Sequence, residues 1–204
     1  MSQYFNIHPE TPQKRLIDQT AEIIRNGGLA IYPTDSCYAL GCKLGEKDAV
    51  DRIRKIRQLD KEHNLTLLCR DLSEIATYAK VNNPAYRMIK SLTPGPYTFI
   101  LRATKDVPRR FQHPKRKTIG LRIPENKIVL DLLESLGEPM LSTSLIMSDD
   151  GIPMFELDEI SDRLGSQVDI IIDGGACGIE ETTVIDLLDD HPVLIRQGKG
   201  VVPE

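Results

Sequence analysis

Short apolar runs alternate with segments of helical spacing along the whole chain, and this alternation limits the fold more than any other feature. The apolar runs have the length of buried strands, whereas the segments between them repeat apolar residues every three or four positions. The runs cover 29–32, 65–69, 98–103, 118–123, 140–144, 170–172, 183–186 and 193–196. Helices are expected at 47–57, 72–79, 84–91, 128–136 and 160–164, with Asp71 or Ser73 as a candidate N-cap. This order predicts an α/β fold in which helices flank one mixed sheet of parallel and antiparallel strands.

A further helix should precede the first apolar run. Thr11 is its candidate N-cap, apolar residues follow from Leu16 to Ile24, and Gly27 would end it. The chain has 204 residues, of which 40% are hydrophobic, so one sizeable core and a single domain over 1–204 are expected. No stretch reaches the roughly 20 apolar residues of a membrane span, and the first residues lack the pattern of a signal peptide. A soluble, cytoplasmic protein is predicted.

Cysteines and histidines are scattered rather than clustered. The four cysteines contain no C-x-x-C pair, and the four histidines are equally dispersed, so reduced thiols are favoured over disulfides and no metal site is predicted. A Cys37 nucleophile is conceivable, but a hydrolase built on Cys37 or Ser144 has no histidine at a supporting spacing.

The apolar run at 29–32 ends at Pro33, which cannot donate a hydrogen bond to a sheet, and a polar cluster follows. Thr34, Asp35, Ser36 and Tyr38 therefore stand where a strand passes into a loop, the usual place for a ligand site in α/β sheets. The alternative interpretation is an ordinary polar turn, in which these side chains satisfy local backbone groups.

Positive charge is concentrated between Arg102 and Arg122. This stretch holds eight Arg or Lys residues against one acid, while the whole chain has a net charge of -4. Clustered cations attract phosphates, so a polyanion such as structured RNA or tRNA is a candidate partner. Phe111 could stack on a base. The alternative is a solvated charged face. The candidate RNA-binding residues are Arg109, Arg110, Lys115, Arg116 and Lys117.

Several distant side chains suit the activation of a carboxylate by ATP. That reaction needs cations to hold phosphates, and hydroxyls to orient substrates. The chain lacks both the G-x-x-x-x-G-K-[ST] loop and the dinucleotide G-x-G-x-x-G pattern. Each candidate also has a structural interpretation, such as a strand-end hydroxyl or an ion pair. The candidates are Lys55, Arg57, Arg122, Arg196, Thr34, Ser144, Thr182 and Thr183.

Six ordered blocks resemble the motifs of the YrdC-like domain family. They are Pro33 to Cys42, Thr93 to Leu101, Gly120 to Pro124, Asp173 to Gly175, Thr182 to Asp186 and Leu194 to Gly198. The resemblance implies a twisted mixed sheet with a concave, positively charged surface. It also implies threonylcarbamoyl-adenylate synthesis from threonine, bicarbonate and ATP with magnesium, without a tightly bound cofactor, and binding of double-stranded RNA or tRNA.

The resemblance also implies roles by position. Thr34, Tyr38 and Thr182 match threonine-binding positions, and Arg122 and Arg196 match nucleotide-facing ones. Ser144 opens the S-x-N motif, in which Ile146 replaces the asparagine. An isoleucine cannot make the hydrogen bonds of an amide, so a weak or diverged synthase is expected, the alternative being an RNA-binding module without synthase activity.

One motif has an ambiguous alignment. Lys55 and Arg57 match K-x-R, which faces the phosphates, but only with a gap. An ungapped alignment puts Arg57 at the lysine and Leu59 at the arginine. Lys55, Arg57 and Ser144 are the candidate catalytic residues.

Overall fold

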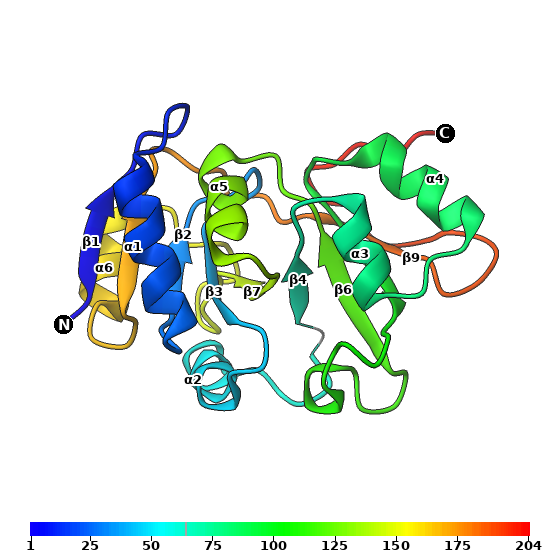
Figure 1. The fold of residues 1–204 in the computed structure, drawn as a ribbon, viewed down its shortest axis with the longest axis horizontal. Coiled ribbons are helices and arrows are strands. Elements are labelled where there is room, and N and C mark those ends of the chain that lie inside the picture. The colour runs from blue at the N-terminus through cyan, green and yellow to red at the C-terminus, as the bar shows by residue number, and fades with distance from the viewer. Residues whose placement is uncertain (64) are drawn as a thin grey trace.

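The computed structural model describes residues 1–63 and 65–204. One long mixed sheet runs through the molecule, with helices on both of its sides (Figure 1). The helices are α1 (Lys14–Arg25), α2 (Lys47–Arg57), α3 (Leu72–Tyr78), α4 (Asn83–Leu92), α5 (Lys127–Leu136) and α6 (Leu157–Leu164). The predicted α/β class is confirmed.

The sheet has ten strands within the described residues, in the order β1-β8-β2-β3-β7-β4-β6-β5-β9-β10. Both kinds of pairing occur, because β4 runs parallel to β6 while β5 runs antiparallel to it. The strands are β1 (Gln3–Asn6), β2 (Ala30–Tyr32), β3 (Ala39–Lys43), β4 (Thr66–Leu68), β5 (Tyr97–Arg102), β6 (Thr118–Arg122), β7 (Met140–Ser144), β8 (Ile170–Asp173), β9 (Thr183–Asp186) and β10 (Val193–Arg196).

The first helix begins later than the sequence predicts. Thr11 does not cap it, because its backbone N–H and its hydroxyl both lie 3.0 Å from His8 Nδ1. Gln13 precedes α1 without a side-chain cap. By contrast, Asp71 does cap α3, accepting a hydrogen bond of 2.8 Å from the Glu74 N–H. Local capping rules therefore succeed where no neighbour competes for the side chain.

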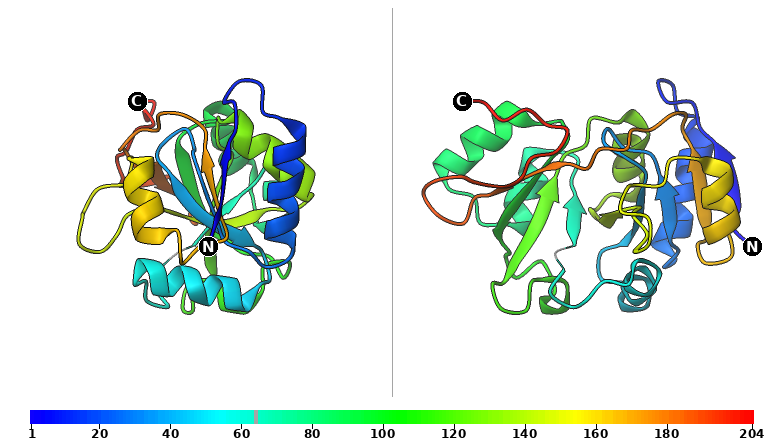
Figure 2. Two further views of the ribbon diagram at one scale, coloured as in Figure 1. Left: turned by 90° about the vertical axis from the view of Figure 1, so that its left-hand side faces the viewer. Right: turned by 180° about the vertical axis from the view of Figure 1, so that it is seen from behind.

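Two hydrophobic clusters cover opposite faces of the sheet. The larger includes side chains of α2, α3, α4 and α6, and the smaller includes side chains of α1 and α5. The left view of Figure 2 shows α1 and α5 on one side of the sheet and α6 on the other. No helix in the described part of the chain is long and apolar enough to cross a membrane. The cytoplasmic location stays a prediction.

Strand register places a row of small and hydroxylated residues on one face. Thr66 of β4 lies opposite both Gly120 of β6 and Ser142 of β7, and Ala39 of β3 lies opposite Ser144. Residues two apart share a face, so this face continues the smaller cluster, to which Ala39 and Leu68 belong. Beyond the region covered by α1 and α5, the same face forms the floor of a cavity.

Gly41 tests how tightly β2 and β3 are packed. A Cβ at this position would overlap the hydroxyl of the fully buried Tyr32. We expect Gly41→Ala to lower the free energy of unfolding by about 1–3 kcal/mol through overpacking, measured by urea denaturation. The same change in a Tyr32→Phe background should cost less, because the phenolic oxygen is gone. Equal costs in the two backgrounds would contradict this account.

Candidate functional site

A cavity of about 560 Å³ lies on the open sheet face. Strands β3 to β7, β9 and β10 all contribute to its walls, together with the β2–β3 loop and the end of α2. Of the predicted site residues, the cavity brings together Thr34, Arg57, Arg122, Ser144, Thr182 and Arg196. These residues are up to 162 positions apart in the sequence.

Thr34 lines the cavity, but its hydroxyl serves the β2–β3 loop. The Oγ1 atom accepts hydrogen bonds from the N–H groups of Ser36 and Cys37, at 3.1 and 3.2 Å, and donates to the Cys37 carbonyl at 2.7 Å. This is the local turn chemistry that the sequence left open as an alternative. The hydroxyl has therefore already donated its proton within the loop.

Tyr38 lies outside the cavity wall. Its side chain is fully buried, and its hydroxyl donates to the carbonyl of Gly175 at 2.8 Å. Burial raises the pKa of the phenol. This hydrogen bond fixes the loop after β8 against the start of β3. Tyr38 therefore supports the wall of the cavity from outside and does not line it.

Arg122, which lines the cavity, forms a buried ion pair with Asp35 of the β2–β3 loop. The Arg122 and Asp35 side chains are 7% and 10% exposed. A second Arg122 N–H donates to Ser36 Oγ at 3.2 Å, and the other Asp35 oxygen accepts from the Glu125 N–H at 2.9 Å. The Arg122 Nε–H is buried and has no acceptor among the described residues. This donor is therefore left without a hydrogen bond inside the wall of the cavity.

Arg57 reaches the cavity from the last residue of α2, where Gln58 adopts a left-handed conformation that ends the helix. The Arg57 Nε–H donates to the Ser144 carbonyl at 2.6 Å, and burial lowers the pKa of the guanidinium. Lys55 is exposed on the same helix and is not part of the wall. The structure thus brings Arg57 to the site and leaves Lys55 outside it.

Arg196 is held by its own surroundings. It donates to the Thr182 carbonyl at 2.9 and 3.0 Å, to the Thr182 hydroxyl at 3.2 Å, and to Glu181 Oε1 at 3.0 Å. The Thr182 hydroxyl also lies 2.8 Å from that of Thr98. Arg196 therefore positions Thr182 and its neighbours.

Sequence reasoning missed Ser142, Thr98, Thr66, His63 and Glu181, which also line the cavity. The buried Tyr32 donates to Ser142 Oγ at 2.7 Å, so the Ser142 proton is free to point at a ligand. Ser142 stands two residues before Ser144, a spacing that places both on one face of a strand. Burial and the nearby Arg57 charge lower the pKa of His63.

Ile146, which replaces the asparagine of the S-x-N motif, lies just beyond the cavity wall. Its N–H donates to the Ser144 carbonyl at 2.9 Å, and its backbone pairs with that of Pro153. The Ser144 carbonyl therefore accepts hydrogen bonds from both the Ile146 N–H and the Arg57 Nε–H. The isoleucine at position 146 is therefore adjacent to the Ser144 carbonyl, which anchors the Arg57 side chain.

The basic loop, residues 103–117, connects β5 with β6. The Phe111 ring is buried, with Arg110 stacked over it at 5.2 Å, so the expectation that Phe111 stacks on a base is wrong. Lys115 pairs with Glu62 at 2.9 Å and Arg116 pairs with Asp186 at 2.7 Å. The Lys117 ammonium contacts the Pro114 carbonyl at 2.9 Å. Arg109 and Arg110 form no ion pair within the described part of the chain.

All four cysteines are free thiols. Cys37 lines the cavity, but burial raises its pKa. A thiol with a raised pKa is a poor nucleophile at neutral pH. No group of three or more His, Cys, Asp or Glu side chains is placed to hold a metal ion among residues 1–63 and 65–204.

The fold and the cavity together define an α/β protein whose open sheet face carries an arginine-lined site. The Sua5/YciO/YrdC family model, described as telomere recombination, matches residues 22–198. The chain belongs to this family. It is 58% identical over 202 residues to YciO of Escherichia coli, covering 99% of this chain and 98% of that protein. The crystal structure of E. coli YciO matches with a TM-score of 0.96, over 98% of each chain.

Distant relatives include threonylcarbamoyl-AMP synthases. A putative threonylcarbamoyl-AMP synthase of Methanocaldococcus jannaschii is 31% identical over 195 residues, covering 95% of this chain and 90% of that protein. The crystal structure of Pyrococcus abyssi Sua5 complexed with L-threonine matches at 29% identity and a TM-score of 0.87, over 96% of this chain and 57% of that chain. The predicted family is confirmed.

The two ion pairs of the cavity should differ in their effect on stability. Asp35→Ala leaves the Arg122 charge buried without its partner, which should cost about 3–5 kcal/mol of unfolding free energy. The Glu181 and Arg196 side chains are 34% and 40% exposed, so Glu181→Ala should cost no more than about 1 kcal/mol. Urea denaturation of both variants measures the difference. Similar costs would show that the Asp35 pair does not hold the site together.

Proposed function

We propose that this protein binds ATP and L-threonine in the cavity and is a weak or diverged threonylcarbamoyl-AMP synthase that also binds structured RNA or tRNA. The observation that carries the proposal is the gathering of Arg57, Arg122 and Arg196 around one hydroxyl-lined cavity. Guanidinium groups suit phosphates and carboxylates, because they donate hydrogen bonds in a planar fork.

Each residue has a distinct part in this proposal. Arg57 and Arg122 contact phosphate oxygens and disperse the negative charge that develops as pyrophosphate leaves. Ser144 and Thr182 orient the nucleotide and the amino acid, and Arg196 holds Thr182 in place. Magnesium enters as the counter-ion of ATP. The synthase relatives, one of them solved with L-threonine, support this choice of substrates.

Two features favour a slow reaction. Asp35 neutralises Arg122, and Glu181 neutralises Arg196, so Arg57 alone among the three has no carboxylate partner within the described residues. Ile146 also brings an apolar side chain where the S-x-N motif has an amide. The triphosphate of ATP would therefore meet less positive charge than three unpaired arginines would provide. It would also lack the hydrogen bonds that an asparagine side chain could make.

Arg57 and Lys55 form a matched pair for testing the enzyme. Purified protein would be incubated with ATP, magnesium, bicarbonate and L-threonine, and pyrophosphate release would be followed with and without threonine. Arg57→Ala should reduce threonine-dependent release by about 100–1000-fold, the usual effect of losing one preorganised donor. Lys55→Ala should stay near the wild-type rate, because Lys55 lies outside the cavity wall.

Three results would count against this assignment. If wild-type protein releases no pyrophosphate in response to threonine, the synthase half of the proposal fails. The RNA-binding module then remains. If Lys55→Ala loses as much activity as Arg57→Ala, the gapped K-x-R alignment holds and the proposed role of the cavity wall is wrong. If neither variant loses activity, the reaction does not use Arg57.

RNA binding is proposed for the basic loop on the strength of Arg109 and Arg110. These two exposed arginines keep their charges unpaired by carboxylates within the described residues, unlike Lys115 and Arg116. Free cations at a surface displace counterions from phosphates. Arg109 and Arg110 should therefore contribute more to RNA affinity than their paired neighbours in the same loop.

Charge reversal tests this ranking. Arg109→Glu/Arg110→Glu should weaken tRNA binding and lower the slope of log affinity against log salt by about 1 for each phosphate that the variant no longer neutralises, measured by filter binding across a salt series. Arg87→Glu/Lys90→Glu on α4 is the matched control, since it makes the same change of charge away from the loop (Figure 1). Equal losses of affinity for both variants would indicate a general charge effect.

A further inference from the structure

Strand β10 forms one end of the sheet and carries apolar side chains that face solvent. Val193, Leu194 and Ile195 are 51%, 47% and 55% exposed, and the sheet order of the described residues ends at β10. Successive strand residues point to opposite faces, so both faces of this strand are uncovered. An open edge with exposed apolar side chains is a template for another strand.

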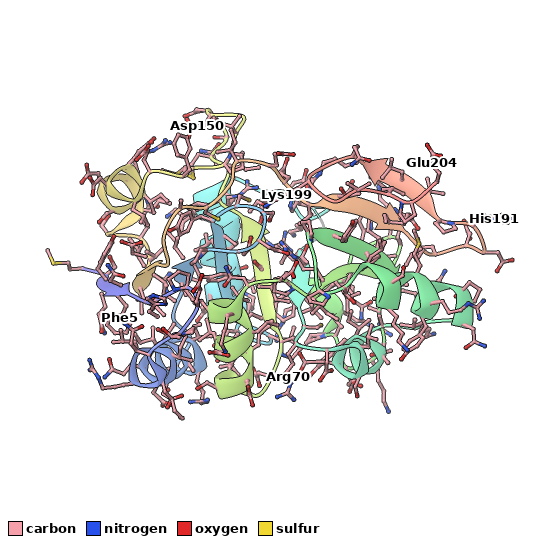
Figure 3. The ribbon with its side chains drawn as sticks, turned by 90° about the horizontal axis from the view of Figure 1, so that it is seen from above. Phe5, Arg70, Asp150, His191, Lys199 and Glu204 are labelled. Atoms are coloured by element: carbon pink, nitrogen blue, oxygen red, sulfur yellow. The ribbon has the colours of Figure 1, made fainter. Side chains whose placement is uncertain are left out.

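The two ends of β10 carry opposite charges. Asp189 and Asp190 precede the strand, and Lys199 follows it. The Lys199 ammonium contacts the backbone oxygen of Asp35 at 2.5 Å but pairs with no carboxylate in the described chain, so its charge is not neutralised. Figure 3 shows His191 at one extreme of the molecule and Lys199 nearer its middle. The strand is therefore acidic at its outer end and basic at its inner end.

We propose that β10 is a docking surface for a second copy of this chain, which pairs with it edge to edge and antiparallel about a twofold axis near Leu194. Antiparallel pairing brings the acidic end of each strand beside the basic end of the other. Parallel pairing would place Asp189 and Asp190 beside their own copies. A twofold interface requires this kind of self-complementarity, and an identical strand supplies both the charges and the apolar side chains.

The strand itself limits how strong this association is. Pro192 stands just before it, and the register shifts between Leu194 and Arg196. Both features shorten the ladder that a second copy can use, so the dimer is weak and dissociates on dilution. Ile195 and Arg196 line the cavity. The second copy therefore lies at the rim of the proposed substrate site.

Sedimentation velocity of the full chain over a dilution series tests the proposal. Wild-type protein should shift from monomer to dimer as its concentration rises. Leu194→Lys should stay monomeric, because it places a charge at the centre of the interface. Ile152→Lys is the matched control, since Ile152 is 51% exposed in the loop after β7, and it should dimerise as the wild type does. Circular dichroism verifies that each variant is folded.

A wild-type protein that remains monomeric at every soluble concentration would overturn the proposal, and so would a dimer that persists in Leu194→Lys. Disulfide trapping tests the antiparallel arrangement in a Cys177→Ser background, in which the three remaining native cysteines are buried. Opposed residues in an antiparallel ladder lie at a Cα distance that a disulfide can bridge. Leu194→Cys should form a covalent dimer on oxidation, and Ile152→Cys should not. Failure of Leu194→Cys to cross-link while the non-covalent dimer forms would overturn the antiparallel pairing.

Discussion

The buried ion pair between Asp35 and Arg122 is the contact on which the site depends. Asp35 belongs to the loop after β2, and Arg122 ends β6 and lines the cavity, so the pair joins elements that are not neighbours in the sheet. The Asp35 carboxylate also accepts a hydrogen bond from the Glu125 N–H, and the Asp35 backbone oxygen accepts one from the Lys199 ammonium near the end of the chain. Removing either charge would leave the other buried, and for that reason a site of this kind is rigid before any ligand arrives.

Hydrogen bonds from neighbouring side chains orient the hydroxyl groups on the cavity floor. Tyr32 is fully buried and must donate its proton, and Ser142 is the acceptor it has. Ser142 can then offer its own proton to a ligand. In the same way, the Thr98 and Thr182 hydroxyls share one hydrogen bond, which uses one of their two protons. The floor therefore presents donors, and the ligand portion that contacts it should carry acceptors such as carboxylate or phosphate oxygens.

Local patterns predicted most of the elements, and α2 has the predicted bounds of 47–57. The strands β1 and β3 were not predicted, because Gln3–Asn6 is only four residues long with a polar residue at each end, and because Ala39–Lys43 follows directly on a polar loop. Arg57 and Arg122 could be predicted as site residues from charge and motif. Ser142 could have been found from its two-residue spacing to Ser144, which places both on one strand face. Thr98 could not, because strand register brings it to the floor, and register depends on partners far away in the sequence.

The same carboxylates that rigidify the site also compete with its ligand. A phosphate that binds Arg122 or Arg196 shares a guanidinium already paired with Asp35 or Glu181. The two cases differ, since the Asp35 pair is buried and the Glu181 pair is half-exposed. Arg122 can offer a ligand only those N–H groups that Asp35 and Ser36 do not use, whereas the ion pair between Arg196 and Glu181 can be broken at little cost. Arg57, anchored through a backbone carbonyl and not through a carboxylate, keeps its charge available. Any phosphate chemistry in this cavity should therefore depend most on Arg57.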